Sequence, residues 1–184
     1  GSTESATAES GQVRYLEGPW PTQDLDAITD DNRDSLASAS ELADFHKSDF
    51  ANVYVDDSGR VVLVPVSSTG VSLAASKLPE LAQVSVEPHA DALSIRAAGE
   101  LGDGLYRVSD QLRHKISAWK GDPRSSHLLV VVWLPLDSRD RSDIEAFAAR
   151  HSLGIDVHFD PGDPPGEKDE SRWEDDIPVA GGFR

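Results

Sequence analysis

The chain has 184 residues, of which 38% are hydrophobic and 27% are charged, and its formal net charge is −16. This acidic balance argues against binding to a nucleic-acid backbone, which requires clustered Lys and Arg. The length suffices for one good core or two small cores in contact, and the absence of cysteine leaves the cellular compartment open.

Residues 1–14 are predicted to form a disordered tail. Ser, Thr, Ala, Glu and Gly dominate this stretch without an apolar period. The opening Gly1-Ser2 is typical of an expression scar, so a signal peptide could have been removed before it.

Residues 15–47 are expected to form an N-terminal helical segment. A loosely apolar stretch from Tyr15 to Ile28 comes first, without long regular structure. A helix is predicted over 34–46 because apolar residues recur there at helical spacing, and Asp31 or Asp34 would cap it.

Residues 48–95 predict a unit of two strands, a helix and a third strand (ββαβ). The Asp-Asp-Ser-Gly sequence at 56–59 has the residues that a hairpin turn prefers. The expected elements are strands at 52–55 and 60–66, a short helix at 71–78 and a strand at 84–86.

Residues 96–160 predict a linking helix and a second ββαβ unit, roughly 70 residues after the first. The most apolar run of the chain, HLLVVVWLPL at 127–136, is too short to cross a bilayer and is typical of a strand buried on both faces. The expected elements are an amphipathic helix at 100–117, strands at 116–119 and 127–136, a helix at 138–150 with a possible capping box from Ser142 to Glu145, and a strand at 155–159.

The predicted fold class is therefore α+β. It consists of duplicated ββαβ units, each a small, mostly antiparallel sheet with helices on one face, joined by an amphipathic helix and preceded by an N-terminal helix. Two unrelated hairpins in an ordinary α+β domain would explain the same pattern, so both interpretations stay open.

Residues 161–184 are predicted to be an acidic linker rich in Pro and Gly, followed by a C-terminal tail. Asp160 to Asp176 contains eight acidic residues against two basic ones. Apolar residues return at Trp173 and Phe183, which leads us to expect a further domain after Arg184.

The sequence predicts no enzymatic site and no cofactor. Asp57-Ser58-Gly59 is superficially similar to the nucleophile segment of chymotrypsin-like peptidases, but its place between two strands predicts a hairpin turn. No nucleophile elbow or Gly-rich phosphate loop after a strand occurs elsewhere.

No metal site is predicted either. The six histidines lack zinc-binding spacing. Asp30, Asn32, Asp34 and Glu41 match four ligand positions of an EF-hand loop, but Ser35 replaces its required glycine. Helix capping explains these acidic residues equally well.

Three stretches together resemble the pro-regions of secreted actinobacterial serine peptidases of the chymotrypsin fold, the streptogrisin and alpha-lytic type. They are the hairpin at 51–65, the linking helix that ends in Ile116-Ser-Ala-Trp119, and the hairpin through Asp122-Pro123. The last ten residues, from Asp175 to Arg184, are more loosely similar to the junction that precedes the mature catalytic domain.

This resemblance implies an exported, non-catalytic module that acts as folding catalyst and inhibitor of a serine peptidase domain, with no nucleic-acid or membrane partner. Its sheet would add to a hairpin of the peptidase and its tail would lie in the active-site cleft. The expected partner-binding residues are Ile155, Val157 and Phe159 on the exposed edge strand, and Trp173, Phe183 and Arg184 in the tail.

Three alternatives remain, one of which is an enzyme of unrecognised type, for which no motif is present. The strand at 155–159 could be covered by the segment from Leu16 to His46 rather than exposed. The chain could also be a stand-alone acidic inhibitor or immunity-type binder of a basic partner, with Asp160 to Asp176 as its contact surface.

Overall fold

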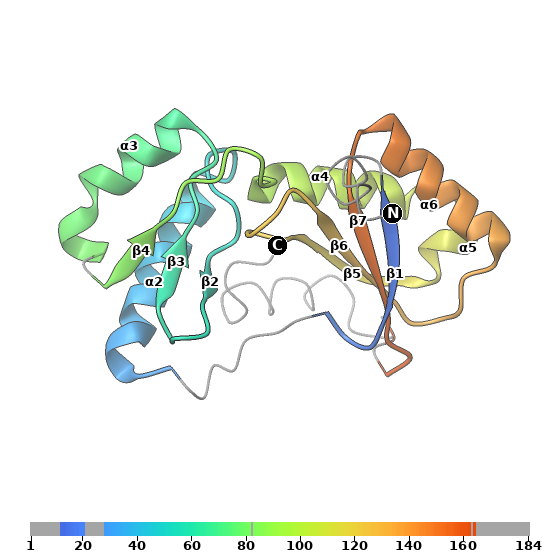
Figure 1. The fold of residues 1–184 in the computed structure, drawn as a ribbon, viewed down its shortest axis with the longest axis horizontal. Coiled ribbons are helices and arrows are strands. Elements are labelled where there is room, and N and C mark those ends of the chain that lie inside the picture. Colours follow the sequence, from blue (N-terminus) through green and yellow to red (C-terminus); the bar gives the residue numbers. More distant parts are fainter. Residues whose placement is uncertain (1–11, 21–27, 82, 163, 165–184) are drawn as a thin grey trace, which may run out of the picture.

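The computed structural model describes residues 12–20, 28–81, 83–162 and 164, and these form two α/β units side by side (Figure 1). The N-terminal unit contains a three-stranded sheet in the order β2-β3-β4, and the C-terminal unit contains a four-stranded sheet in the order β1-β7-β6-β5. The chain therefore has an α+β fold with two small mixed sheets.

The N-terminal unit is built around β3, whose three residues are all buried. β2 pairs with it antiparallel and β4 pairs with it parallel, while α2 packs against one face of the sheet. The element bounds are α2 Asp30–Phe45, β2 Tyr54–Val55, β3 Val61–Leu63, α3 Ser68–Ser76, the 3₁₀ helix η2 Leu78–Leu81 and β4 Val84–Val86.

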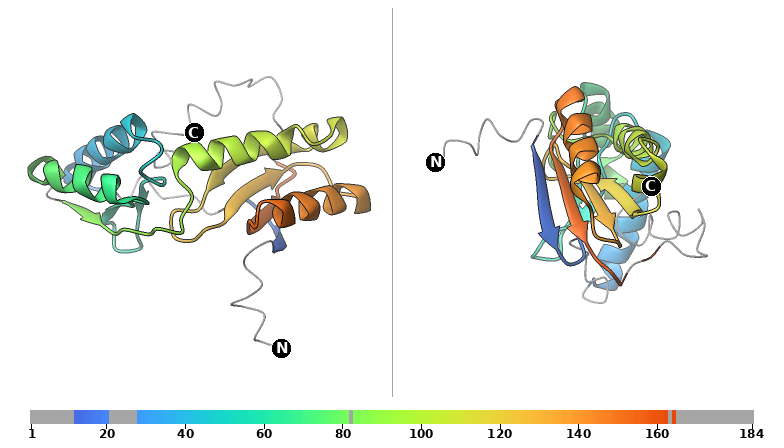
Figure 2. Two further views of the ribbon diagram at one scale, coloured as in Figure 1. Left: turned by 90° about the horizontal axis from the view of Figure 1, so that it is seen from above. Right: turned by 90° about the vertical axis from the view of Figure 1, so that its right-hand side faces the viewer.

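The C-terminal unit is built around β6, whose five residues are buried. β5 pairs with it antiparallel, and β7 pairs with it parallel after the crossover through α6. α4 and α6 lie on the same face of this sheet (Figure 2). The bounds are β1 Val13–Glu17, α4 Ile95–Tyr106, α5 Asp110–Arg113, β5 Ile116–Gly121, β6 Leu128–Val132, α6 Ser138–Arg150 and β7 Ile155–Phe159.

α4 connects the two units, because its first residue belongs to one core and its later residues to the other. Ile95 packs in the core of the N-terminal unit, whereas Ala98 and Leu105 pack in the core of the C-terminal unit. A second contact joins the units directly, where the Asn52 side-chain amide donates to the Gly121 carbonyl at 3.1 Å.

Both units contain elements in the order ββαβ, in which the first two strands pair antiparallel and the second and third strands pair in parallel. That the two units are duplicates of each other stays a prediction. The expectation of mostly antiparallel sheets is wrong. A helix between the second and third strands carries the chain back to the same end of the sheet, so those strands pair in parallel.

Several predicted boundaries also need correction. The helix predicted over 100–117 is two helices, because Ser109 caps a new helix and Ile116 belongs to β5. α2 begins four residues before the predicted 34–46 helix, with Thr29 as its N-cap. The capping box of α6 is formed by Asp137 and Asp140, not by Ser142 and Glu145.

The N-terminal segment differs most from expectation. Residues 13 and 14 were predicted within a disordered tail and Tyr15 in an irregular stretch, yet all three belong to β1.

No helix in the described part of the chain is long and apolar enough to cross a membrane.

Two glycines in α4 offer a matched test of this packing. A Cβ at Gly102 would lie 2.0 Å from the Trp119 indole, whereas a Cβ at Gly99 would meet nothing within 4 Å. We expect Gly102→Ala to lower the free energy of unfolding by about 1–3 kcal/mol through overpacking. Gly99→Ala should raise it by up to about 1 kcal/mol through helix propensity.

Denaturant unfolding of both variants measures these effects. If Gly102→Ala were as stable as Gly99→Ala, α4 would not pack against β5 in this way.

Candidate functional site

β1 is an edge strand: β7 lies on one side of it, and no other described strand lies on its other side. The pairing with β7 is parallel, from Val13 opposite Ile155 to Glu17 opposite Phe159. An edge strand presents a row of backbone donors and acceptors, which is what strand addition by a partner protein requires.

The direction of these backbone groups follows from the two ends of the β1–β7 ladder. The Gly18 N–H donates to the Phe159 carbonyl, and the Gln12 carbonyl accepts from the Ile155 N–H, each at 2.9 Å. Because the direction alternates along a strand, the even-numbered residues of β1 face β7. The N–H and C=O groups of its odd-numbered residues point outward; these are Val13, Tyr15 and Glu17.

The Tyr15 side chain fastens β1 to α6 on the helix-covered face of the sheet. Its hydroxyl donates to Glu145 Oε2 at 2.8 Å, and the Arg141 guanidinium lies 4.4 Å from its ring centre. Burial and the neighbouring Glu145 carboxylate both raise the pKa of Tyr15, so it stays a neutral donor.

On the opposite face of the sheet, the Asp156 carboxylate joins β1 to β7. Arg14 donates to it through Nε at 2.9 Å and Nη2 at 2.7 Å, and His127 Nδ1 lies 3.2 Å from Asp156 Oδ1. Burial alone would raise the pKa of Asp156, but the hydrogen bonds from His127 and Arg14 outweigh it and lower the pKa to about 2. The carboxylate is therefore ionised at any moderate pH.

His158, two residues further along β7, is also buried, with 7% of its surface exposed. Its ring interacts with the backbone of Gly18, where β1 ends, and its Nδ1 atom has no hydrogen-bond partner. Burial lowers its pKa, so the neutral ring is favoured.

The structure corrects the predicted partner edge. Ile155, Val157 and Phe159 belong to β7, which lies between β1 and β6, so this strand is not an edge. Their side chains pack in the core under α6, and Ile155 and Val157 are at most 2% exposed. Trp173, Phe183 and Arg184 lie outside the described residues.

The sequence motifs that suggested a calcium site or a catalytic serine form the start of a helix and a hairpin turn. Asp30, Asn32 and Asp34 lie within the first turns of α2, so they do not form a calcium loop. Ser58 lies in the turn between β2 and β3, where its N–H and hydroxyl both donate to Asp56 Oδ1. Within the described ranges, no group of three or more His, Asp or Glu side chains is placed to hold a metal ion.

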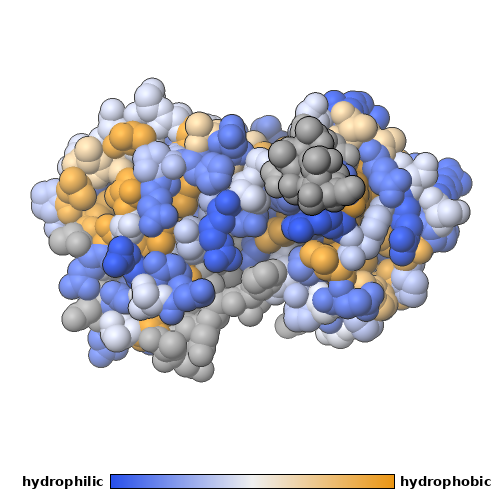
Figure 3. Space-filling model, viewed as in Figure 1, coloured by the Kyte–Doolittle hydropathy of each residue, from blue (hydrophilic) through white to orange (hydrophobic). Residues whose placement is uncertain are grey.

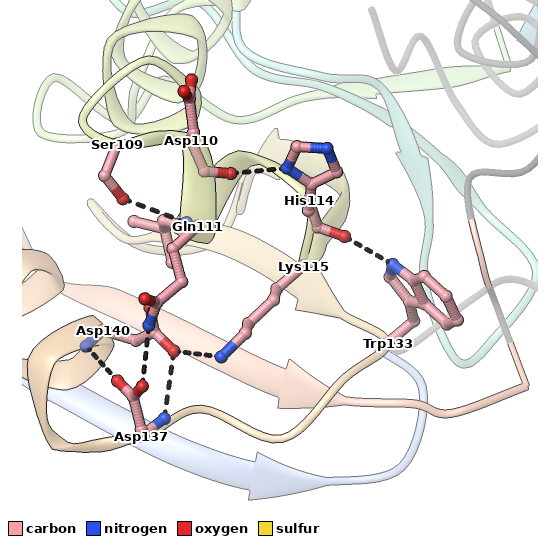
Figure 4. A network of polar contacts seen from close by, with 9 residues as sticks. Ser109, Asp110, Gln111, His114, Lys115, Trp133, Asp137 and Asp140 are labelled. Atoms are coloured by element: carbon pink, nitrogen blue, oxygen red, sulfur yellow. Dashed lines mark hydrogen bonds and ion pairs between the residues drawn. The ribbon is translucent and has the colours of Figure 1, made fainter.

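A second polar cluster, shown in Figure 4, is structural. The buried Asp140 carboxylate accepts hydrogen bonds from Gln111 Nε2 at 2.8 Å, Lys115 Nζ at 2.5 Å and the Asp137 N–H at 3.0 Å. It thereby fastens the start of α6 to the turn between α5 and β5. These three donors occupy three of the roughly four acceptor positions of the carboxylate, which leaves it little capacity for a ligand.

A groove of about 370 Å³, lined by both apolar and charged side chains, lies between the end of α2 and η2 in the N-terminal unit. Leu42, Phe45 and Leu81 line it, and Phe45 is 74% exposed. Hydrophobic residues also gather on the side of this unit that Figure 3 shows, where α3 and β4 lie. The groove adds accessible apolar surface but no chemistry.

Sequence reasoning missed both β1 and the cluster around Asp156. The available signal was the stretch Val13-Arg14-Tyr15, in which an apolar, a charged and an aromatic residue alternate as in a half-buried strand. Its pairing with a strand more than 140 residues away has no local signature.

Comparison with known proteins does not assign the chain. No protein-family model matches its sequence, and no curated protein matches it significantly.

The ionised Asp156 makes a testable contribution to stability. Its pKa falls from 3.8 to about 2 on folding, so it stabilises the fold above about pH 4 and loses this effect as the pH falls towards 2. We expect Asp156→Asn to lower the free energy of unfolding by at least ~2 kcal/mol at pH 7. The difference from the wild type should shrink by about 2 kcal/mol on going down to pH 2.

Denaturant unfolding across this pH range provides the measurement, and Asp57→Asn in the exposed β2–β3 turn is the control. The control should change stability by less than about 0.5 kcal/mol. A pH-independent gap between Asp156→Asn and the wild type would contradict the ion-pair assignment.

Proposed function

We propose that the protein is a non-catalytic binding module that recognises an extended segment of a partner protein. The segment adds as a fifth strand along the outer edge of β1. The outward backbone groups of Val13, Tyr15 and Glu17 carry this proposal, because each offers a donor and an acceptor in strand geometry.

The edge of β1 suits this role better than β5, the other edge of the same sheet. The outer side of β5 already meets the N-terminal unit, where Asn52 donates to the Gly121 carbonyl. β1 is also held on both faces, by Tyr15 on α6 and by Arg14 on Asp156. A strand fixed in this way loses little further conformational entropy when a partner pairs with it.

The partner we propose is the catalytic domain of a secreted serine peptidase, with this chain as its pro-region. What supports this is the resemblance carried by residues 51–65, by Ile116-Ser-Ala-Trp119 and by the hairpin through Asp122-Pro123. In this role the module is exported, catalyses the folding of the peptidase and inhibits the folded enzyme. Pairing with a strand of the folded peptidase stabilises the folded state over the unfolded chain. Folding is accelerated to the extent that this pairing already forms in the folding transition state.

A refolding experiment tests the partner. A streptogrisin-type peptidase domain is denatured in guanidinium chloride and diluted with or without this chain. We expect recovered peptidase activity to rise with the amount of chain, and the folded peptidase to be inhibited by excess chain. Serum albumin at equal mass is the control, and equal recovery with albumin would contradict the pro-region role.

A second experiment tests the edge itself. Glu17→Pro removes an outward N–H without touching the ladder to β7, and Glu17→Ala removes only the side chain. We expect Glu17→Pro to weaken peptidase binding about tenfold or more, because a hydrogen bond is lost and the ring obstructs pairing. Glu17→Ala should bind like the wild type.

Binding is measured by titration calorimetry, with melting temperatures as the check on folding. Equal affinity of both variants at unchanged stability would exclude the β1 edge, even if the peptidase is the partner.

The net charge of −16 supports a second candidate, a stand-alone acidic binder of a basic partner. Salt separates the two, because binding through exposed acidic residues weakens steeply with ionic strength and strand addition does not. With the same peptidase, we expect affinity to change by less than about threefold between 0.05 and 0.5 M NaCl if backbone pairing dominates. A loss of a hundredfold or more would favour the acidic binder.

A further inference from the structure

We infer that β1 is an acid-released edge strand, whose attachment to β7 is controlled by protonation of His158. This concerns the free chain and does not depend on the proposed partner. It rests on a cluster of charged side chains on the face of the sheet opposite α4 and α6.

His158 lies where proton uptake directly affects the end of β1. In the β1–β7 register it stands opposite Leu16, and its ring interacts with the backbone of Gly18. The ring is buried and its Nδ1 atom has no partner. A proton added at Nδ1 would therefore be a buried donor without an acceptor, which is unfavourable.

Burial is the largest influence on His158 and disfavours its protonation, whereas the hydrogen bond to the Gly18 backbone favours it, and the neighbouring charges act in both directions. Arg14 on β1 and Lys120 on β5 both act against protonation of the ring, and Asp156 on β7 favours it. The Asp156 carboxylate already accepts two hydrogen bonds from Arg14 and one contact from His127. The attraction of Asp156 to a protonated His158 therefore offsets the cost of burying that charge only in part.

Proton linkage gives the direction of the effect. Burial lowers the pKa of His158 in the closed sheet, so the attachment of β1 is fully present above the ordinary histidine pKa of about 6.5 and weakens as the pH falls below it. One proton taken up on opening shifts the opening equilibrium by up to about tenfold per pH unit. His127 acts in the opposite direction, because its protonation strengthens the hydrogen bond to Asp156.

β1 is the strand that detaches from the sheet, because it pairs with one described strand whereas β7 and β6 each pair with two. It is five residues long, and on this face the Arg14–Asp156 ion pair joins it to β7 beside His158. Its departure would uncover the side of β7 that it pairs with.

Hydrogen exchange followed by NMR tests this inference on the whole chain. The reporters are the Gly18 and Ile155 amides, which bond across the β1–β7 ladder, and the reference is the Ala51 amide, which bonds to Val64 in the other unit. After correction for intrinsic rates, we expect the protection of Gly18 and Ile155 relative to Ala51 to fall by up to about tenfold per unit between pH 6.5 and 5.

Two variants assign the effect. His158→Gln removes the titrating ring and should make the protection ratio independent of pH in this range. His127→Gln removes the histidine that contacts Asp156, and the protection ratio should still fall towards low pH, at least as steeply as in the wild type. A pH-independent ratio in the wild type, or an unchanged dependence in His158→Gln, overturns the inference.

The ring itself provides a readout that needs no variant. The Cε1 shift of His158 is followed against pH in the wild-type chain. We expect its midpoint below the ordinary value of about 6.5. A midpoint at or above that value overturns the inference, even if His158→Gln fails to fold.

Discussion

A single buried carboxylate determines how the four-stranded sheet is assembled. Asp156 is 4% exposed, and it is compatible with the interior only because Arg14 and His127 supply hydrogen bonds to it. This requirement also fixes the register of β1. A slip by one residue would carry Arg14 to the face packed against α6 and turn Tyr15 away from Glu145. The ion pair therefore contributes specificity of pairing as well as stability, and the backbone groups that β1 presents at its outer edge depend on it.

The two units are small, and α4 makes them one structure. Neither the three-stranded sheet with α2 and α3 nor the four-stranded sheet with α4, α5 and α6 is large enough to be very stable alone. Ile95 belongs to the first core, and Ala98 and Leu105 belong to the second, so a single rigid helix transmits the position of one sheet to the other. The absence of side chains at Gly102 and Gly121 matters here, because Trp119 and Ala98 occupy the space that a Cβ would need.

The strands that sequence alone predicted best are those with a strong local signal. The continuous apolar run at 127–136 contains β6, and the alternation at 155–159 coincides with β7. Alternation indicates that one face is buried, but it does not reveal which strands lie on either side, so β7 was expected at an edge and is central. β1 was missed because it is short, contains Arg14 and Glu17, and gains its partner from the far end of the chain. The cluster around Asp156 could not be predicted without that pairing, since its members come from three separate strands or their ends.

The proposed binding edge and the proposed acid release act on the same strand, so they are thermodynamically coupled. A partner segment paired with the outer side of β1 can bind only while β1 remains on β7. Its binding must therefore favour the closed sheet, in which burial keeps His158 neutral. The coupling is reciprocal. The free energy by which a bound partner opposes opening of the sheet equals the free energy by which opening, when driven by proton uptake, weakens partner binding. A strand held only by apolar contacts would lack this coupling, because it has no group that titrates between pH 5 and 7. The polar face of β1 and β7 thus supplies the part of the attachment that depends on pH, and the apolar packing under α6 supplies a part that does not.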